Sequence, residues 1–360
     1  MSELLDILRR EIRLQGPITL ARYMDICLSH SNHGYYPKQD PLGRAGDFTT
    51  APEISQMFGE LIGLWAGVVW QQMGQPSAVN LVELGPGRGT LMADALRAAS
   101  IVPSFLDAIT VHLVEISPAL RAVQAEALAA HGPVWHDNDT TLPSGPLIII
   151  ANEFFDALPI LQFERRASFW HERRVGLAEG DQLCFVLSPP QSTNPMVPDS
   201  HKNAPDGTIV EVCPAAWNIV ARLADAVGQH GGGALIIDYG HDGRHAGDTF
   251  QAVKDHRFHP PFEMPGEVDL TAHVDFGALA SAANTLSTIA YGPLAQGAFL
   301  EALGIRERAD ALMKEAPVAL RDEIRSALAR LTGTEEMGTL FKAMAIARSD
   351  TPPPPGFEIA

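Results

Sequence analysis

The sequence predicts a doubly wound α/β fold, in which helices cover both faces of a mostly parallel sheet. Apolar strand-like runs alternate with helix-like segments from Val79 onward, which is the pattern of such folds. One of these runs leads directly into closely spaced glycines, and several end in acidic residues. The strand candidates are 79–84, 110–115, 147–151, 233–238, 285–291 and 340–347. Helices are expected at 89–99, 118–130, 214–229 and 296–314.

Four stretches fall outside this alternation. An N-terminal region, 1–78, is expected to carry helices at 2–14, 19–29 and 53–73 before a core at 79–350. An insertion at about 160–210 contains the apolar-polar runs LQFERR, FWHERRVGL and LCFVLS, which are typical of an antiparallel meander. A second insertion at 241–275 is rich in glycine, histidine and proline and reads as a long irregular loop. The proline-rich tail, 351–360, is expected to fray.

The composition is that of a globular protein. Of its 360 residues, 46% are hydrophobic and 19% are charged. A formal net charge of -17 argues against nonspecific binding to nucleic acid, which requires clustered Lys and Arg. The strongly apolar run Leu61–Trp70 is half the length needed to span a membrane, so no span is expected.

Targeting and cysteine usage point to the cytoplasm of a bacterium. The first helix carries Glu3, Asp6 and Glu11, whereas transit peptides are poor in acids. The three cysteines show neither a disulfide framework nor metal-ligand spacing. The histidines between 241 and 273 also lack a metal-binding pattern, so we predict no metal site.

The most informative stretch is LVELGPGRGTL, residues 81–91. Gly85, Gly87 and Gly89 allow the backbone to turn sharply after the strand and to approach a ligand closely, with Pro86 between them. A dinucleotide site would space its glycines as G-x-G-x-x-G, and Glu83 would repel a pyrophosphate. An acid at this place suits an ammonium group. The pattern therefore favours S-adenosylmethionine, which has an α-amino group and no phosphate.

A second acid supports this ligand. Glu115, followed by Ile116, ends the next strand candidate and is placed to bind two ribose hydroxyls. The alternative is that glycine-rich turns are common and that both acids are merely solvated.

The segment NEFFDALP, residues 152–159, follows a buried strand. It delivers Asn152, Glu153 and Asp156 to the carboxyl end of that strand, where ligands sit in open α/β sheets. The two acids can hold a cationic acceptor such as guanidinium through bidentate hydrogen bonds. The alternative is that Asp156 caps a helix and that Phe154 and Phe155 belong to the core.

The segment RAGDFTTAPEIS, residues 44–55, is less specific. Asp47 and Glu53 add polar groups close to glycines that permit tight backbone approach. From the residues alone, a turn followed by a helix cap at Thr50 or Ser55 is the favoured interpretation.

Together these motifs resemble the MidA-like family. The resemblance covers nearly the whole chain and rests on GYY at 34–36, GDFTTAPEISQMFGELIG at 46–63, VELGPGRGTL at 82–91, NEFFDALP at 152–159, IIDYGHDG at 236–243 and DLTAHVDF at 269–276. It implies a seven-stranded, Rossmann-like class I methyltransferase core with S-adenosyl-L-methionine as the methyl donor. Mitochondrial members of the family symmetrically dimethylate an arginine in a core subunit of respiratory complex I and help to assemble that complex.

The resemblance also implies roles for individual residues. Glu83 and the three glycines would form the cofactor cradle, Glu115 the ribose clamp, and Asp137, after a weak strand at 133–136, the contact to the adenine edge. Asp47 and Glu53 would border the methyl-transfer pocket opposite Asn152 and Glu153. The expected acceptor is a protein arginine. Methylation of a small molecule or another side chain, or a non-catalytic assembly chaperone with the same fold, are the alternatives.

Overall fold

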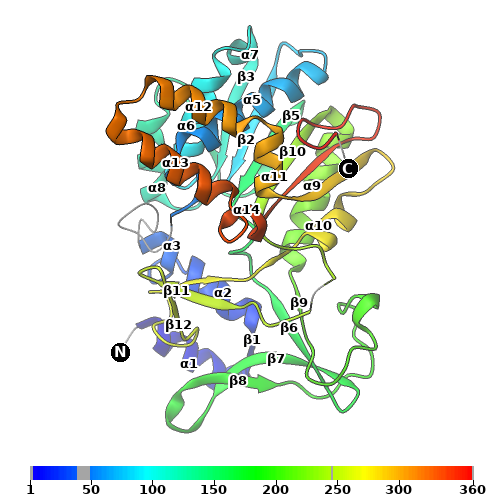
Figure 1. The fold of residues 1–360 in the computed structure, drawn as a ribbon. Coiled ribbons are helices and arrows are strands. Elements are labelled where there is room, and N and C mark those ends of the chain that lie inside the picture. The colour runs from blue at the N-terminus through cyan, green and yellow to red at the C-terminus, as the bar shows by residue number, and fades with distance from the viewer. Residues whose placement is uncertain (1–2, 39–48, 245, 359–360) are drawn as a thin grey trace.

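A computed structural model describes residues 3–38, 49–244 and 246–358. Its largest element is an eight-stranded sheet in which seven strands follow the order β15-β16-β10-β5-β2-β3-β4 (Figure 1). The five strands from β10 to β4 are parallel, and β16 is antiparallel to both of its neighbours. The eighth strand, β14, pairs with β10 and is one more than expected. The bounds are β2 Val79–Leu84, β3 Ile109–Val114, β4 Val134–His136, β5 Leu147–Asn152, β10 Gly232–His241, β14 Val274–Asp275, β15 Thr288–Ala295 and β16 Phe341–Arg348.

Helices cover both faces of this sheet. Because alternate strand residues point to opposite faces, Leu81 and Ile150 pack on one side, while Val82 and Ile149 pack on the other. The first face is covered by α5 (Gln56–Gln72), α6 (Thr90–Ala99), α7 (Phe105–Ala108), α11 (Gln296–Ala302), α12 (Ile305–Glu315), α13 (Val318–Thr332) and α14 (Met337–Leu340). The second face is covered by α9 (Pro214–His230) and α10 (Phe276–Ala283). The expected α/β fold, with helices on both faces of a mostly parallel sheet, is confirmed.

A smaller unit lies below the main sheet in Figure 1 and has its own core. The N-terminal helices pack there against strands of both expected insertions, whereas α5 packs on the main sheet. The unit contains α1 (Glu3–Gln15), β1 (Ile18–Thr19), α2 (Leu20–Ser29), α3 (Tyr35–Lys38), β6 (Leu161–Arg166), β7 (Phe169–Leu177), β8 (Leu183–Leu187), β9 (Ile209–Val212), β11 (Gln251–Lys254), β12 (Arg257–His259) and β13 (Asp269–Thr271). The meander forms a five-stranded sheet with β1, while β12-β11-β13 form another.

Several local expectations are wrong. The stretch 241–275 is not an irregular loop, because β11 and β12 form a short hairpin and β11 also pairs with β13 further along the chain. The described part of the tail, 351–358, does not fray, since Phe357 is buried against Phe299.

Several helices also differ from expectation. The helix expected at 53–73 is interrupted at Ser55, which is extended and caps α5. The one expected at 296–314 is divided before Gly304, which adopts a left-handed conformation. Helices α3, α7, α10, α13 and α14 were not expected. Within the described residues, no helix is long and apolar enough to cross a membrane.

Candidate active site

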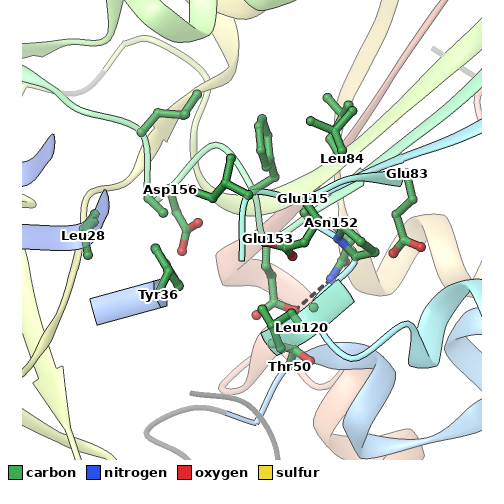
Figure 2. Close-up of a pocket in the computed structure, with 18 of the residues that line it drawn as sticks. Leu28, Tyr36, Thr50, Glu83, Leu84, Glu115, Leu120, Asn152, Glu153 and Asp156 are labelled. Carbon is green, nitrogen blue, oxygen red and sulfur yellow. Dashed lines mark hydrogen bonds between the residues drawn. The ribbon is translucent and has the colours of Figure 1, made fainter. Parts of the chain in front are cut away.

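A cavity of about 440 Å³ lies at the carboxyl ends of β2, β3 and β5. Strand β2 is the point where the order of the parallel strands reverses, and ligands of open α/β sheets bind at such points. The opposite wall comes from the smaller unit. In Figure 2, Glu83 lies at one side of the cavity, Leu28 and Tyr36 at the other, and Asn152 and Glu153 between them.

The cavity collects most of the residues that the sequence singled out. These are Glu53, Glu83, Gly85, Pro86, Gly87, Glu115, Ile116, Asp137, Asn152, Glu153 and Asp156. Gly89 is not among the lining residues, because it serves as the left-handed N-cap of α6. Asp47 lies outside the residues that the structure describes.

The glycine loop forms one wall of the cavity. Gly85 and Gly87 have φ values of 64° and 54°, a backbone conformation that residues with a Cβ atom rarely adopt. A Cβ on Gly85 would also lie 2.9 Å from Cδ2 of Phe154. The loop thus needs glycine at Gly85 both for its backbone conformation and for its packing.

Glu83 is a buried acid at the end of β2. Its side chain is 3% exposed, and its Oε2 atom has no hydrogen-bond partner within the described residues. Burial raises the pKa of Glu83 to about 8. A buried carboxylate with an unpartnered oxygen is stabilised most by a ligand that brings a positive charge and N–H donors.

Glu115 occupies the corresponding place at the end of β3. Its Oε1 accepts a hydrogen bond from the Ser117 amide at 2.7 Å, and its Oε2 accepts one from Nε2 of Gln124 at 3.3 Å. Burial raises the pKa of Glu115, and these hydrogen bonds act in the opposite direction. Arg121 binds the backbone oxygen of Glu115 and donates to Oδ1 of Asp137 at 2.6 Å, so it connects two strand ends.

Gln124 on α8 (Pro118–Ala127) was not expected at the site. Its amide nitrogen also donates to the backbone oxygen of Gly87 at 2.7 Å, while its amide oxygen accepts from Nε1 of Trp135 at 2.8 Å. This fully buried side chain therefore fixes the glycine loop relative to Glu115. Its sequence position within an amphipathic helix carried no signal of that role.

Asn152 and Glu153 form the middle of the cavity. Oε1 of Glu153 accepts from the Ala51 amide at 2.9 Å and from Nδ2 of Asn152 at 3.0 Å. The other amide atom of Asn152, Oδ1, is buried without a partner in the described residues. Burial raises the pKa of Glu153 to about 7, with the negative charge of Asp156 contributing in the same direction.

Helix α4 (Ala51–Ile54) connects this middle part to the glycine loop. Its Glu53 accepts a hydrogen bond from Oγ1 of Thr90, the first residue of α6, at 2.6 Å. Its Ala51 amide binds Glu153, as described above. The favoured interpretation of this segment as a turn with a cap is correct for Ser55, whose hydroxyl accepts from the Met57 amide.

The far end of the cavity is also acidic. Asp156 is buried, which raises its pKa to about 6, with the Tyr239 hydroxyl acting in the opposite direction. It begins no helix, so its alternative interpretation as a cap is wrong, whereas Phe155 does belong to the core. Tyr36 of α3 donates to Oδ1 of Asp269 at 3.2 Å, and both residues line the cavity together with Asp25.

Sequence reasoning missed these last three residues as site residues. Tyr36 and Asp269 stand in motifs that the family resemblance includes, but no pattern placed them together. Only the packing of α2, α3 and β13 does so.

The charge of the cavity is one-sided. Nine lining residues are acids, whereas Arg88 is the single basic residue among the described ones that line it. Asp137 and Asp139 pair with arginines outside the lining, Arg121 and Arg222. In the described part of the chain, no group of three or more His, Cys, Asp or Glu residues is arranged to hold a metal ion. The cavity is thus suited to positively charged organic ligands.

Comparisons with known proteins agree with this geometry. The family model described as "Putative S-adenosyl-L-methionine-dependent methyltransferase" matches residues 61–294. The protein arginine methyltransferase NDUFAF7 of Danio rerio mitochondria is 39% identical over 372 residues, which are 96% of this chain and 87% of that protein. The mitochondrial NDUFAF7 of Homo sapiens is 37% identical, covering 96% of this chain and 83% of that protein.

A solved structure shows the same fold. A Burkholderia thailandensis protein, crystallised with S-adenosyl-homocysteine, superposes with a TM-score of 0.82 at 28% identity, covering 99% of this chain and 93% of that one. The extent of the family match and the identity to the relatives confirm the resemblance to the MidA-like family. The chain belongs to this family of S-adenosyl-L-methionine-dependent methyltransferases.

Proposed function

We propose that this enzyme transfers the methyl group of S-adenosyl-L-methionine to an arginine side chain of a protein. The observation that carries the acceptor is the acidic middle and far end of the cavity, where Asp156 is buried and Glu153 is half-buried. Among the described residues that line the cavity, the one basic side chain is Arg88 of the glycine loop, and the charge of Arg330 offsets only part of the rise in the pKa of Glu153. A guanidinium group would supply the missing positive charge and up to five N–H donors. The names of the curated relatives support the same acceptor.

The residues at the other end fit the cofactor. Oε2 of Glu83 and Oδ1 of Asn152 are buried acceptor atoms without donors in the described structure, and an α-ammonium group would satisfy both. Glu115 would hold the ribose hydroxyls and Asp137 the adenine edge. Pro86 and Ile116 would contribute apolar contacts, while Gly85 and Gly87 would let the backbone approach closely.

Methyl transfer needs little covalent chemistry from the protein. The bound cofactor supplies an electrophilic methyl group on a sulfonium. Glu153 would orient the guanidinium so that one nitrogen attacks this carbon as the carbon–sulfur bond breaks. Methylation leaves one surplus proton on that nitrogen, and Glu153, whose burial raises its pKa to about 7, can accept it.

A second carboxylate would hold the other side of the guanidinium. Asp156 and Glu53 are the two candidates. One oxygen of Glu53 already accepts a hydrogen bond from the hydroxyl group of Thr90. Asp47 stays a candidate from the sequence alone.

By the family resemblance, the acceptor protein is a core subunit of respiratory complex I or a related protein. A cytoplasmic site of action is supported by the three free cysteines of the chain.

Transfer of a labelled methyl group tests this function. The wild type, incubated with labelled cofactor and cell extract, should place label on a protein arginine that peptide mass spectrometry identifies. Glu153→Gln should lower the rate by about 100-fold or more, because the neutral amide neither holds guanidinium as strongly nor accepts its proton. Glu263→Gln, an exposed change outside the cavity, should leave the rate unchanged.

Three outcomes would contradict the proposal. Label on another side chain or on a small molecule would favour the first alternative acceptor class. A stable partner complex that forms without any transfer, and that survives loss of cofactor binding, would favour an assembly chaperone. Full activity of Glu153→Gln on a proven arginine would remove Glu153 from its proposed role.

A further inference from the structure

Asp238, near the end of β10, is a buried carboxylate that does not line the cavity. Its side chain is fully buried. Among the described residues, Asp238 forms no ion pair with Lys, Arg or His. It nevertheless lies beside the segment that carries Glu153, because β10 pairs in parallel with β5 and Ile237 is opposite Asn152. A buried charge in such a place requires hydrogen-bond donors.

Those donors are four backbone amides. Oδ2 of Asp238 accepts from the amides of Phe154 at 3.2 Å, Phe155 at 2.9 Å and Asp156 at 3.2 Å. Oδ1 accepts from the amide of Tyr239 at 2.9 Å. Three consecutive amides that converge on one oxygen fix the direction of the turn in which they lie.

The start of that turn adopts an uncommon conformation. Glu153 has a φ of 51°, which non-glycine residues rarely adopt and which persists only where the surroundings hold it. Its own amide donates to the backbone oxygen of Ile237 at 2.9 Å. The turn is therefore held to β10 at Glu153 by that bond and at the next three residues by Asp238.

We propose that Asp238 is a positioning residue for methyl transfer: by binding three successive amides, it fixes the turn that directs Glu153 and Asp156 into the cavity. The proposal rests on the acceptor role assigned to Glu153. A general stabilising role is the simpler explanation, and it predicts that loss of Asp238 affects folding and nothing else. The two explanations differ in what happens to the turn of a variant that remains folded.

Asp238→Asn and Asp238→Glu separate them. The amide of asparagine cannot accept at both positions, so at least one set of backbone donors loses its partner. Glutamate keeps the charge but moves the oxygens by one methylene. We expect kcat to fall by about 100-fold in both variants, since a displacement of about 1 Å costs roughly that factor, while the affinity for S-adenosylhomocysteine stays within about threefold.

Glu211→Gln is the matched control. Glu211 also accepts hydrogen bonds from two consecutive amides, those of Thr249 at 3.0 Å and Phe250 at 3.1 Å, but it lies outside the main cavity. This variant should lose thermal stability without losing kcat. Hydrogen exchange should speed up at residues 154–156 in the Asp238 variants and at 249–250 in the control.

A measurement without the acceptor keeps the test independent of the proposed function. In carboxyl-labelled protein, the pKa of Glu153, about 7 in the wild type, should move toward its ordinary value near 4.5 in Asp238→Glu, which keeps a carboxyl group at this position, as the turn opens to water. Unchanged exchange at 154–156 and an unchanged pKa of Glu153 would overturn the positioning role. If these change as expected but the wild type methylates no arginine, the proposed function fails instead. If Asp238→Asn does not fold, Asp238→Glu decides the same question.

Discussion

Glu83→Gln should weaken the binding of S-adenosylhomocysteine and remove much of its pH dependence. In the wild type, the unpartnered Oε2 of Glu83 would accept a hydrogen bond from the ammonium group of the ligand. Glutamine has the same size but no charge. A hydrogen bond to a charged group contributes about 1.5–3 kcal/mol, so affinity at pH 8 should fall by about 10- to 150-fold.

The pH dependence follows from the raised pKa of Glu83, about 8. Without ligand, about half of the molecules carry an ionised Glu83 at pH 8, but only about one in a hundred do at pH 6. An ammonium ligand binds the ionised form, so wild-type affinity should weaken by about 50-fold between pH 8 and pH 6. The folding stability of the free protein should change with pH in the opposite sense, falling as the pH rises. Since its folded-state pKa lies above the ordinary value near 4.5, Glu83 destabilises the fold as pH rises from 4.5 through 8, and Glu83→Gln removes that loss.

Isothermal titration in two buffers of different ionisation enthalpy measures this directly. At pH 7 the wild type should release about 0.9 proton per ligand bound, because most of its Glu83 side chains are protonated beforehand. Glu83→Gln should release close to none. Glu126→Gln, an exposed change on α8, should behave as the wild type. Wild-type binding without proton release, or an unchanged affinity of Glu83→Gln, would refute the assignment of the ammonium to this residue.

Two further variants test the surroundings of the site. Gln124→Leu leaves the Gly87 oxygen and the Trp135 indole nitrogen without their partner, so unfolding by urea should show a loss of about 1–3 kcal/mol, and titration should show about tenfold weaker S-adenosylhomocysteine binding. Normal affinity would mean that the glycine loop holds its shape without Gln124. Phe357→Ala removes a ring buried against Phe299 and should cost about 3–4 kcal/mol of unfolding free energy with unchanged ligand affinity; a loss below about 1 kcal/mol would show that the tail is not part of the core.

The part of the site at the strand ends was predictable from local sequence for a physical reason. Buried parallel strands appear as apolar runs, and the residues that follow each run must lie at one edge of the sheet. Glu83, Glu115, Asn152 and Glu153 all lie there and line one cavity. Gly89 shows the limit of this logic, because the same glycine pattern serves a helix cap as well as a ligand.

The smaller unit could not be predicted in the same way. Its strands β11, β12 and β13 have only three or four residues each, too few for a periodic pattern, and they pair across loops. Tyr36 and Asp269 are 233 positions apart in sequence, yet their side chains are hydrogen bonded. Asp238 was visible as the end of an apolar run, but its amide partners depend on the register between β10 and β5.

The two ends of the cavity are formed in different ways. The end that we propose for the cofactor depends on residues at strand ends, so its geometry follows from the sheet itself. The end that we propose for the acceptor is assembled from α2, α3, α4, the turn after β5 and β13, which converge only when both cores are formed. Local opening of the smaller unit would therefore disturb Tyr36 and Asp269 before it disturbs Glu83.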